Sequence, residues 1–202
     1  MGLCHHAKPQ GCGLRTPLTS YLRIDHDSEN NLIQDLITSV AAWLAGRDGW
    51  LGCSLTTQTF ELSAPLPWYP GFVGPHWDRT GCIVLPRPPY LAIESVSCVD
   101  RAGAAVLMSP AVYSTNVGGE GLSRLSFGSG VPWLGSAADL ASIVVRYQAG
   151  YGPRPEDVDH GHRCAMLMTI ARLYANRGDG LTAEFREDRF VQSIFAPYRV
   201  WI

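Results

Sequence analysis

Residues 164–177 read CAMLMTIARLYANR, and the first eight of them carry no charge. A surface helix shows a polar face within that length. We therefore expect this helix to be covered on most sides, by its own bundle or by a neighbouring subunit. The chain closes on residues 195–202, which read FAPYRVWI and form an aromatic tail. Both stretches indicate packing against other protein, and neither has the pattern of an active site.

Two helices are predicted near the start of the chain. Thr16-Pro17 can open a short helix over residues 18–24, and Asp27 or Ser28 can cap the next one. The apolar residues of this second helix recur at three- and four-residue spacing: Leu32, Ile33, Leu36, Ile37, Val40, Ala41 and Leu44. That spacing predicts a strongly amphipathic helix, which ends at Gly46.

Between Gly46 and Gly152 the pattern changes to short runs of β-formers separated by Gly and Pro. Strands are predicted at residues 56–62, 82–85, 93–99, 104–108, 122–127 and 142–149. Residues 100–103 form a hairpin turn, with Gly103 available for a positive φ. Several short strands with turns between them predict a small antiparallel sheet or barrel.

After Pro153 and Pro155 the chain returns to helix, and a last helix is predicted over residues 182–195. The predicted fold class is therefore α+β: a helical bundle formed by both chain ends, with a small antiparallel β-domain inserted between them. The predicted segments are a flexible arm at 1–15, a bundle core at 16–52 and 153–194, a β-rich insert at 53–152 and a C-terminal tail at 195–202.

The composition is that of a folded protein with no global basic field. The chain has 202 residues, 46% of them hydrophobic, and a formal net charge of −2. This charge gives no sign of a nucleic-acid or anionic-membrane partner. The longest uncharged run, residues 102–119, is interrupted by Pro110 and ends in glycines, so we expect no membrane span and no membrane partner. The start of the chain has no secretory pattern. Six scattered cysteines without a CxxC favour reduced thiols, and disulfides are the alternative in an extracellular particle.

The sequence does not favour a catalytic or metal-binding site. The sequence has no GxxxxGKS/T, HExxH or GxSxG pattern. His160 and Cys164 share a helix face but His162 points away, so we expect exposed histidines and a packed cysteine rather than a metal site. Two more sets of polar residues are not predicted to bind a metal. The first matches no common zinc spacing: Cys4, His5, His6 and Cys12. The second fits helix capping: Asp25, Asp27 and Glu29. We predict no enzymatic activity, no cofactor and no metal.

Four aromatic residues lie in Gly/Pro-rich loops: Trp68, Tyr69, Trp77 and Trp133. Exposed loop aromatics mark binding surfaces more often than chance. These four residues are compatible with a surface that binds a carbohydrate or another protein. They are equally compatible with side chains that cover the core of a small β-domain.

The order of several motifs resembles a known family. In chain order they are Leu18-Thr19-Ser20-Tyr21-Leu22-Arg23-Ile24-Asp25, Leu32-Ile33 with Leu36-Ile37, Thr57-Gln58-Thr59-Phe60-Glu61-Leu62, Leu85-Pro86-Arg87-Pro88-Pro89, Val144-Val145-Arg146-Tyr147-Gln148-Ala149-Gly150-Tyr151-Gly152, Leu173-Tyr174-x-Asn176-Arg177 and Ala196-Pro197-Tyr198-Arg199-Val200-Trp201. From about Leu14 to the C-terminus, the chain resembles the head–tail connector (adaptor, or head-completion) proteins of long-tailed bacteriophages and gene transfer agents.

The resemblance implies a structural virion protein at the neck, assembled in the host cytoplasm. Copies would form a ring, usually of twelve, between the portal and the next neck, stopper or tail-completion protein. The ring would extend the DNA channel, with packaged DNA as a candidate partner bound without sequence specificity. The alternative that the loop aromatics leave open is a peripheral tail-associated module that binds a carbohydrate or a receptor.

Three sets of site residues follow as hypotheses. The first would bind the portal: Phe195, Tyr198, Arg199, Val200, Trp201 and Ile202. The second would form the ring contact: Leu36, Val40, Trp43, Met166, Ile170, Leu173 and Arg177. The third would meet the tail partner through loops: Trp68, Tyr69, Trp77 and Trp133.

Overall fold

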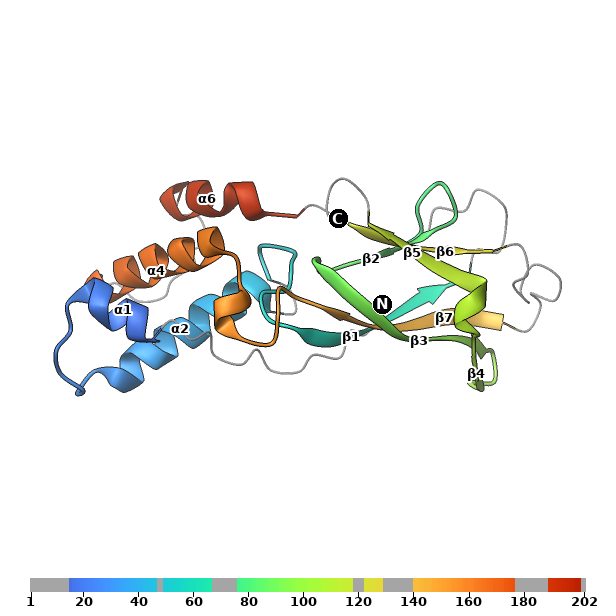
Figure 1. The fold of residues 1–202 in the computed structure, drawn as a ribbon, viewed down its shortest axis with the longest axis horizontal. Helices are drawn as coiled ribbons and strands as arrows, with labels where there is room; N and C mark the ends of the chain where they lie inside the picture. The colour runs from blue at the N-terminus through green and yellow to red at the C-terminus, as the bar shows by residue number, and fades with distance from the viewer. Residues whose placement is uncertain are drawn as a thin grey trace. The chain divides into compact units, whose positions relative to one another are not determined.

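The computed structural model describes residues 15–46, 49–66, 76–117, 122–128, 140–176 and 189–200. The fold is α+β, as the sequence predicts, with helices near both ends of the chain and antiparallel strands between them (Figure 1). The chain divides into two compact units. The β unit spans Gln58–Ala149, and the helical unit holds the described residues on either side of it.

The described helices of the helical unit come from both sides of the β unit in sequence. They are α1 Arg15–Leu22, α2 Asn30–Ala45, α4 His160–Ala175 and α6 Arg189–Phe195, with 3-10 turns η2 Pro155–Asp157 and η3 Ala196–Tyr198. The N-cap of α2 is Glu29, so the prediction of Asp27 or Ser28 is wrong. Asp27 is engaged instead by the side-chain amide of Asn30, which donates to its carboxylate (2.6 Å).

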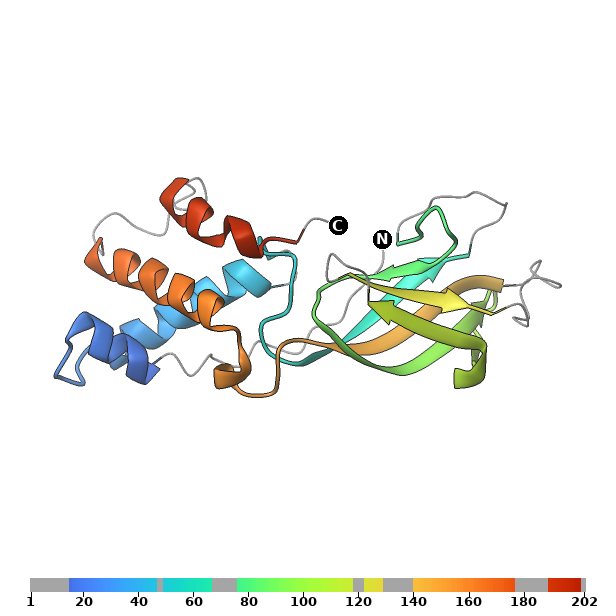
Figure 2. The ribbon, with the colours of Figure 1, turned by 45° about the horizontal axis from the view of Figure 1, so that its top comes forward.

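The core of the helical unit forms around α4, which contacts α1, α2 and α6 (Figure 2). The predicted periodicity of α2 is confirmed, because its apolar face is buried: Ile33, Leu36, Ile37, Val40, Ala41, Leu44 and Ala45. The side chain of Asp159 caps α4 by accepting from the Gly161 N–H (2.9 Å). α4 is covered on most sides by α1, α2 and α6, and Cys164, Met168 and Arg172 form an exposed stripe along it at four-residue spacing.

Residues 53–57 and 150–152 lie in the helical unit, whereas the sequence places them in the β-rich insert. The Thr57 N–H donates to the Gly152 carbonyl oxygen (2.8 Å) and joins the two segments. Gly150 allows this close approach, because its φ is +134° and a Cβ there would overlap the facing backbone. Only glycine adopts such a conformation without strain.

The β unit contains two antiparallel sheets. The first has the order β1-β7-β3-β4, and the second has the order β2-β6-β5. The strands are β1 Gln58–Pro65, β2 Ile83–Leu85, β3 Tyr90–Asp100, β4 Ala105–Leu107, β5 Tyr113–Val117, β6 Ser123–Phe127 and β7 Leu140–Ala149, with the 3-10 turn η1 Pro110–Val112 before β5. Six of these strands match predicted runs, and β5 is a strand that the sequence analysis did not predict.

One apolar core fills the space between the two sheets. Buried and partly exposed residues alternate along β1, as expected for a strand with one face on a core. Phe60 of β1 lies opposite Tyr147 of β7, with ring centroids 5.7 Å apart. The second sheet contributes Ile83, Leu85 and Leu125 to the same buried cluster. Burial of each large aliphatic or aromatic side chain contributes roughly 1.5–3 kcal/mol.

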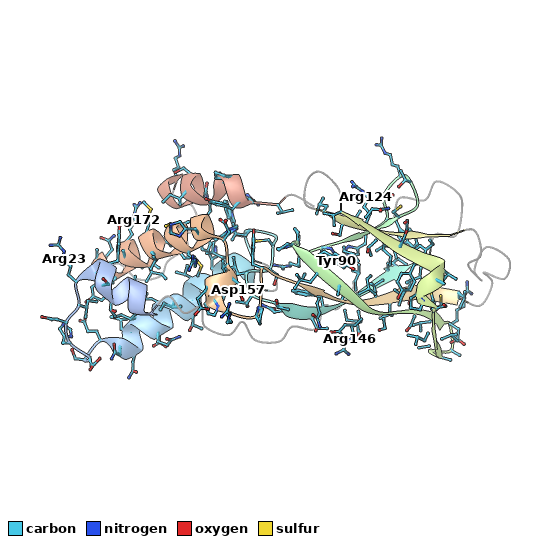
Figure 3. All side chains as sticks on the ribbon, in the orientation of Figure 1. Arg23, Tyr90, Arg124, Arg146, Asp157 and Arg172 are labelled. Atoms are coloured by element: carbon cyan, nitrogen blue, oxygen red, sulfur yellow. The ribbon has the colours of Figure 1, made fainter. Side chains whose placement is uncertain are left out.

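The other face of the first sheet carries a polar network. The guanidinium of Arg146, labelled on β7 in Figure 3, donates to the Glu94 carboxylate (2.7 Å). Gln148 and Thr59 donate to the same carboxylate at 2.8 and 3.0 Å. These hydrogen bonds, that of Gln148 first, hold the pKa of Glu94 below its ordinary value. Arg146 and Gln148 reach Glu94 across the adjacent strands β7 and β3, and Thr59 reaches it from β1 on the far side of β7, so the network reinforces the register of all three strands.

Candidate assembly surface

The C-terminal segment, defined here as Phe195–Val200, packs on the helical unit. Phe195 is the last residue of α6, and its side chain is fully buried. Its ring meets Trp43 of α2 edge-on, with centroids 6.3 Å apart and planes at 82°. Pro197 follows within η3, where the chain cannot continue as an α-helix. The segment is therefore anchored at its first residue.

Trp50 and Leu51, which follow α2, contact the end of this segment. Trp50 stacks on Trp43, with centroids 6.0 Å apart, and the guanidinium carbon of Arg199 lies 4.4 Å from the centroid of the Trp50 ring. This is the geometry of a cation–π contact. The Val200 N–H donates to the Leu51 carbonyl oxygen (2.8 Å). Both contacts hold the chain end against residues 50 and 51.

Tyr198 lies against the start of α4. Its ring centroid is 4.4 Å from that of His162, and the ring centroid of Tyr151 is 5.2 Å from the same imidazole. Gly161 makes room for this contact, because a Cβ at that position would overlap the Tyr198 hydroxyl. Burial, with a smaller effect of nearby negative groups, raises the pKa of Tyr151 to about 12. Two phenols and an imidazole thus form one aromatic cluster.

The structure brings together four of the predicted portal-binding residues and changes their interpretation. Tyr198, Arg199 and Val200 lie partly buried beside Phe195 on their own subunit. Phe195 has no surface for a partner, because its side chain is fully buried in the subunit core. A tail that leaves the subunit at residue 195 is therefore wrong for the described residues, and Trp201 and Ile202 lie outside them.

Most of the predicted ring-contact residues are also in the subunit core. The buried ones are 8% exposed or less: Leu36, Val40, Met166 and Ile170. These four side chains lie in one buried apolar cluster and offer no exposed surface to a second subunit. They are therefore corrected from ring-contact residues to core residues. Trp43 and Leu173 are partly buried at the edge of the same core, and Arg177 lies outside the described residues.

Trp77 belongs to the core of the β unit rather than to an exposed loop. It is 5% exposed, and its indole N–H donates to the Pro65 carbonyl oxygen (2.7 Å). Its ring lies 6.2 Å from that of Phe127. Trp77 is therefore corrected from a tail-partner contact to a core residue. The other loop aromatics, Trp68, Tyr69 and Trp133, lie outside the described residues.

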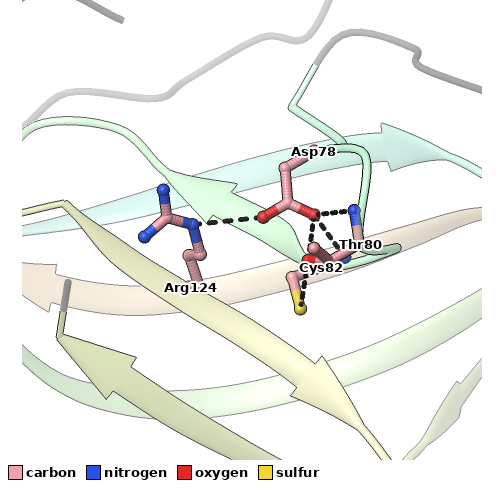
Figure 4. A network of polar contacts seen from close by, with 4 residues as sticks. All are labelled: Asp78, Thr80, Cys82 and Arg124. Carbon is pink, nitrogen blue, oxygen red and sulfur yellow. Dashed lines mark hydrogen bonds and ion pairs between the residues drawn. The ribbon is translucent and has the colours of Figure 1, made fainter.

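A polar network beside Trp77 fixes the turn into β2 (Figure 4). The Asp78 carboxylate accepts from the backbone N–H groups of Thr80 (2.9 Å) and Cys82 (3.0 Å), and from the guanidinium of Arg124 (3.1 Å). Burial alone would raise the pKa of Asp78. The hydrogen bonds and the Arg124 charge outweigh it and hold the pKa below its ordinary value. The network has the character of a turn support, not of a ligand site.

The predicted exposure at the start of α4 is confirmed for His160, which is exposed, and is wrong for His162 and Cys164. His162 is 3% exposed, whereas Cys164 is exposed and its Sγ lies 3.7 Å from His160 Nε2. The described residues contain no group of three or more His, Cys, Asp or Glu side chains placed to hold a metal ion. None of their helices combines the length and apolar composition that a membrane crossing requires.

Sequence reasoning missed His162, Trp50 and Leu51. A signal for His162 was present: residues 162, 166 and 169 follow four- and three-residue spacing, which puts the histidine on the buried stripe of α4. The contacts of Trp50 and Leu51 with the C-terminal segment had no local signal, because they are made with residues far along the chain. They could only be found in three dimensions.

Comparison with known proteins gives a likeness of fold. No protein-family model matches the sequence. No curated protein matches it. A chain of the structure "Virion of native gene transfer agent (GTA) particle" is similar, with a TM-score of 0.71 and 17% identity over 99% of this chain and 96% of that chain.

Two neck structures contain similar chains. One is "Neck of empty GTA particle computed with C6 symmetry", with a TM-score of 0.69 and 15% identity over 99% of this chain and 96% of that chain. The other is "Neck of native GTA particle computed with C12 symmetry", with a TM-score of 0.66 and 16% identity over 100% of this chain and 96% of that chain. At these identities the likeness shows a shared fold.

Proposed function

We propose that this chain is a structural protein of the neck of a phage-like particle. Identical copies form an adaptor ring between the portal and the next neck or tail protein. The observation that carries the proposal is the extent of the fold likeness. It spans 99–100% of this chain and 96% of each neighbour, so both units recur together in the same chain order.

The proposed role is structural rather than catalytic. Two of the similar chains come from necks computed with C6 and C12 symmetry. A closed ring of identical subunits needs one heterologous contact that is repeated around the axis. Twelve copies around the DNA channel are the proposed arrangement. Packaged DNA would pass through the channel and meet the ring through phosphate contacts without sequence specificity.

We place the proposed ring contact on the exposed apolar residues of the helical unit. Tyr21, Leu32 and Met168 are 58%, 38% and 39% exposed. Trp43 and Leu173, at the edge of the core, would extend this surface. Large apolar side chains on an exposed helix face are residue types that a protein interface buries.

A matched pair of variants tests this contact. Met168→Asp puts a charge on the exposed face of α4, and Val106→Asp puts one on β4, where Val106 is 67% exposed. Each variant is expressed with the portal protein of the same particle, and ring formation is followed by electron microscopy. Met168→Asp should keep the circular dichroism spectrum and lose the ring, whereas Val106→Asp should keep both. Loss of the ring only in Val106→Asp would move the contact to the β unit.

The proposed portal contact uses the chain end together with Tyr198 and Arg199. A chain that stops after Val200 keeps Phe195 in the core and keeps the Val200–Leu51 hydrogen bond. This truncation should fold and fail to join DNA-filled heads, as measured by cosedimentation. Normal attachment of the truncated chain would contradict a portal-binding role for Trp201 and Ile202.

A further inference from the structure

His162 is the most unusual buried group in the helical unit. Its ring is 3% exposed, and neither ring nitrogen has a hydrogen-bond partner among the described residues. Buried polar groups are almost always hydrogen-bonded, since an unpaired one costs about 1–3 kcal/mol. An ordinary core position of this kind would be filled by an apolar ring. Packing alone therefore does not explain why an imidazole occupies this site.

The cover over the imidazole is the C-terminal segment. Tyr198 is the nearer of its two aromatic neighbours, with centroids 4.4 Å apart against 5.2 Å for Tyr151. Tyr151 is held from within the chain, because its N–H donates to the Leu55 carbonyl oxygen (3.1 Å). Tyr198 is followed by Arg199, whose guanidinium stacks on Trp50, and by Val200, whose N–H donates to Leu51. As the ring nearer to the imidazole, Tyr198 is the cover whose movement would open the site.

The titratable groups that the described elements bring to the ring are few. They are Tyr198 from η3, Tyr151 from the segment after β7, and Asp159 at the start of α4. The Oδ2 atom of Asp159 lies 3.5 Å from His162 Nδ1, close enough to pair with an imidazolium but without hydrogen-bond geometry to the neutral ring. Cys53 is a further titratable neighbour of Tyr151.

We propose that His162 and Tyr198 form a pH-sensitive latch, in which protonation of the imidazole releases the chain from Tyr198 onward. An imidazolium at this position would place its second N–H in a site where the described residues offer no acceptor. Water reaches that nitrogen only when Tyr198 moves away, whereas Phe195 stays in the core. The Asp159 carboxylate lies near the Nδ1 atom of the imidazolium, and the Nε2 N–H has no such partner among the described residues. The latch is a property of the subunit alone and holds whether or not the chain belongs to a neck ring.

The direction of the effect follows from linkage. Burial, opposed in part by the Asp159 carboxylate, lowers the pKa of His162 from its ordinary value near 6.5. The docked state therefore binds fewer protons than the released state once the pH falls below about 6.5. Docking is fully favoured above that pH and weakens as the pH falls toward the lowered pKa. Within that interval the docking constant changes by up to about tenfold for each pH unit.

Hydrogen exchange at the Val200 amide measures the latch directly. This amide is paired with Leu51 in the docked state, and its protection factor, corrected for intrinsic exchange at each pH, should fall by up to about tenfold per pH unit below 6.5. Amides of β7 serve as the internal control and should stay protected. Unchanged protection of Val200 between pH 7.5 and 5 would overturn the proposal.

Three variants separate the latch from a merely structural role. His162→Phe keeps a ring in the site and cannot take a proton, so Val200 protection should become independent of pH. Asp159→Asn keeps a good helix N-cap but removes the carboxylate that opposes the effect of burial, so the docked pKa of His162 should fall further and the loss of protection at low pH should become larger. Gly161→Ala should release Tyr198 at every pH, since its Cβ overlaps the phenol hydroxyl. A full pH response that survives in His162→Phe, or a smaller loss of protection at low pH in Asp159→Asn, would contradict the assignment of the proton to His162.

Discussion

Phe195 meets Trp43 edge-on inside the core of the helical unit, with ring centroids 6.3 Å apart and planes at 82°. This contact joins the last described α-helix to the second one, and the Phe195 side chain is fully buried. Edge-to-face aromatic pairs contribute about 0.5–1.5 kcal/mol beyond the area that they bury. The start of the C-terminal segment is therefore part of what stabilises the subunit.

Phe195→Ala should lower the free energy of unfolding of the helical unit by about 3–5 kcal/mol, the usual range for emptying a buried aromatic site. Tyr21→Ala is the control, because Tyr21 is 58% exposed and its truncation should change stability by about 0.5 kcal/mol or less. Urea titration followed by hydrogen exchange in α2 measures both. Equal stabilities of the two variants would show that Phe195 is not a core residue.

Gly150→Ala should destabilise the protein by about 2–4 kcal/mol, because it combines a strained backbone with steric overlap. Gly150 has a φ of +134°, and a Cβ there would overlap the backbone of Thr56. Gly103→Ala separates the two effects. Gly103 also has a positive φ, +87°, but a Cβ there has open space around it, so the cost should be about 1 kcal/mol. Thermal unfolding of both variants measures the difference, and a cost at Gly103 as large as that at Gly150 would contradict the overlap.

Asp78→Asn should weaken the β unit at neutral pH by about 1 kcal/mol. The amide oxygen can still accept from the Thr80 and Cys82 N–H groups but without the negative charge, and the amide NH2 cannot accept from Arg124, whose side chain is 40% exposed and screened. The pKa of Asp78 is lowered in the folded protein. Its contribution is therefore present above the unfolded value near 3.9 and is lost as the pH falls through the folded value.

The urea midpoint of the β unit, measured at pH 6 and pH 3, tests this dependence. The wild-type chain should lose more stability on acidification than Asp78→Asn, because the variant has no carboxylate to protonate at that position. An identical loss in both chains would exclude Asp78 from the acid response.

Thiol labelling should follow the exposure of the four described cysteines. Cys164 is exposed and Cys82 is intermediate, whereas Cys53 and Cys98 are buried. Burial also raises the pKa of Cys98, which lowers its thiolate fraction. Brief alkylation of the native protein with peptide mapping by mass spectrometry should modify Cys164 first. Early modification of Cys53 or Cys98 would contradict the packing of either core.

The regular elements could be predicted because their signals are local. The three- and four-residue spacing around Ile33 and Ile37 marks α2, and the alternation around Phe60 marks β1. By contrast, β5 reads Tyr-Ser-Thr-Asn-Val and has no apolar alternation. Its strand conformation depends on pairing with β6, where the hydroxyls of Ser114 and Ser126 lie 2.8 Å apart. Such a partner is invisible from the local sequence.

The errors at the candidate site have a similar cause. Trp77 lies in a Gly/Pro-rich stretch and Phe195 begins the aromatic tail, which made both of them look like exposed binding residues. Their partners are Pro65 and Trp43, and the second lies far away in the sequence. Aromatic residues beside turns fit a binding surface and a core lid equally well, so only the tertiary contacts decide between the two.

The central claim is the location of this chain in the particle, and a cryo-electron microscopy map of the neck of particles that carry it tests that claim most directly. The proposed function predicts a closed ring of twelve copies at the portal, with the two-unit fold fitting the density of each copy. Peripheral density at a tail fibre, or a neck ring built from a different protein, would contradict it.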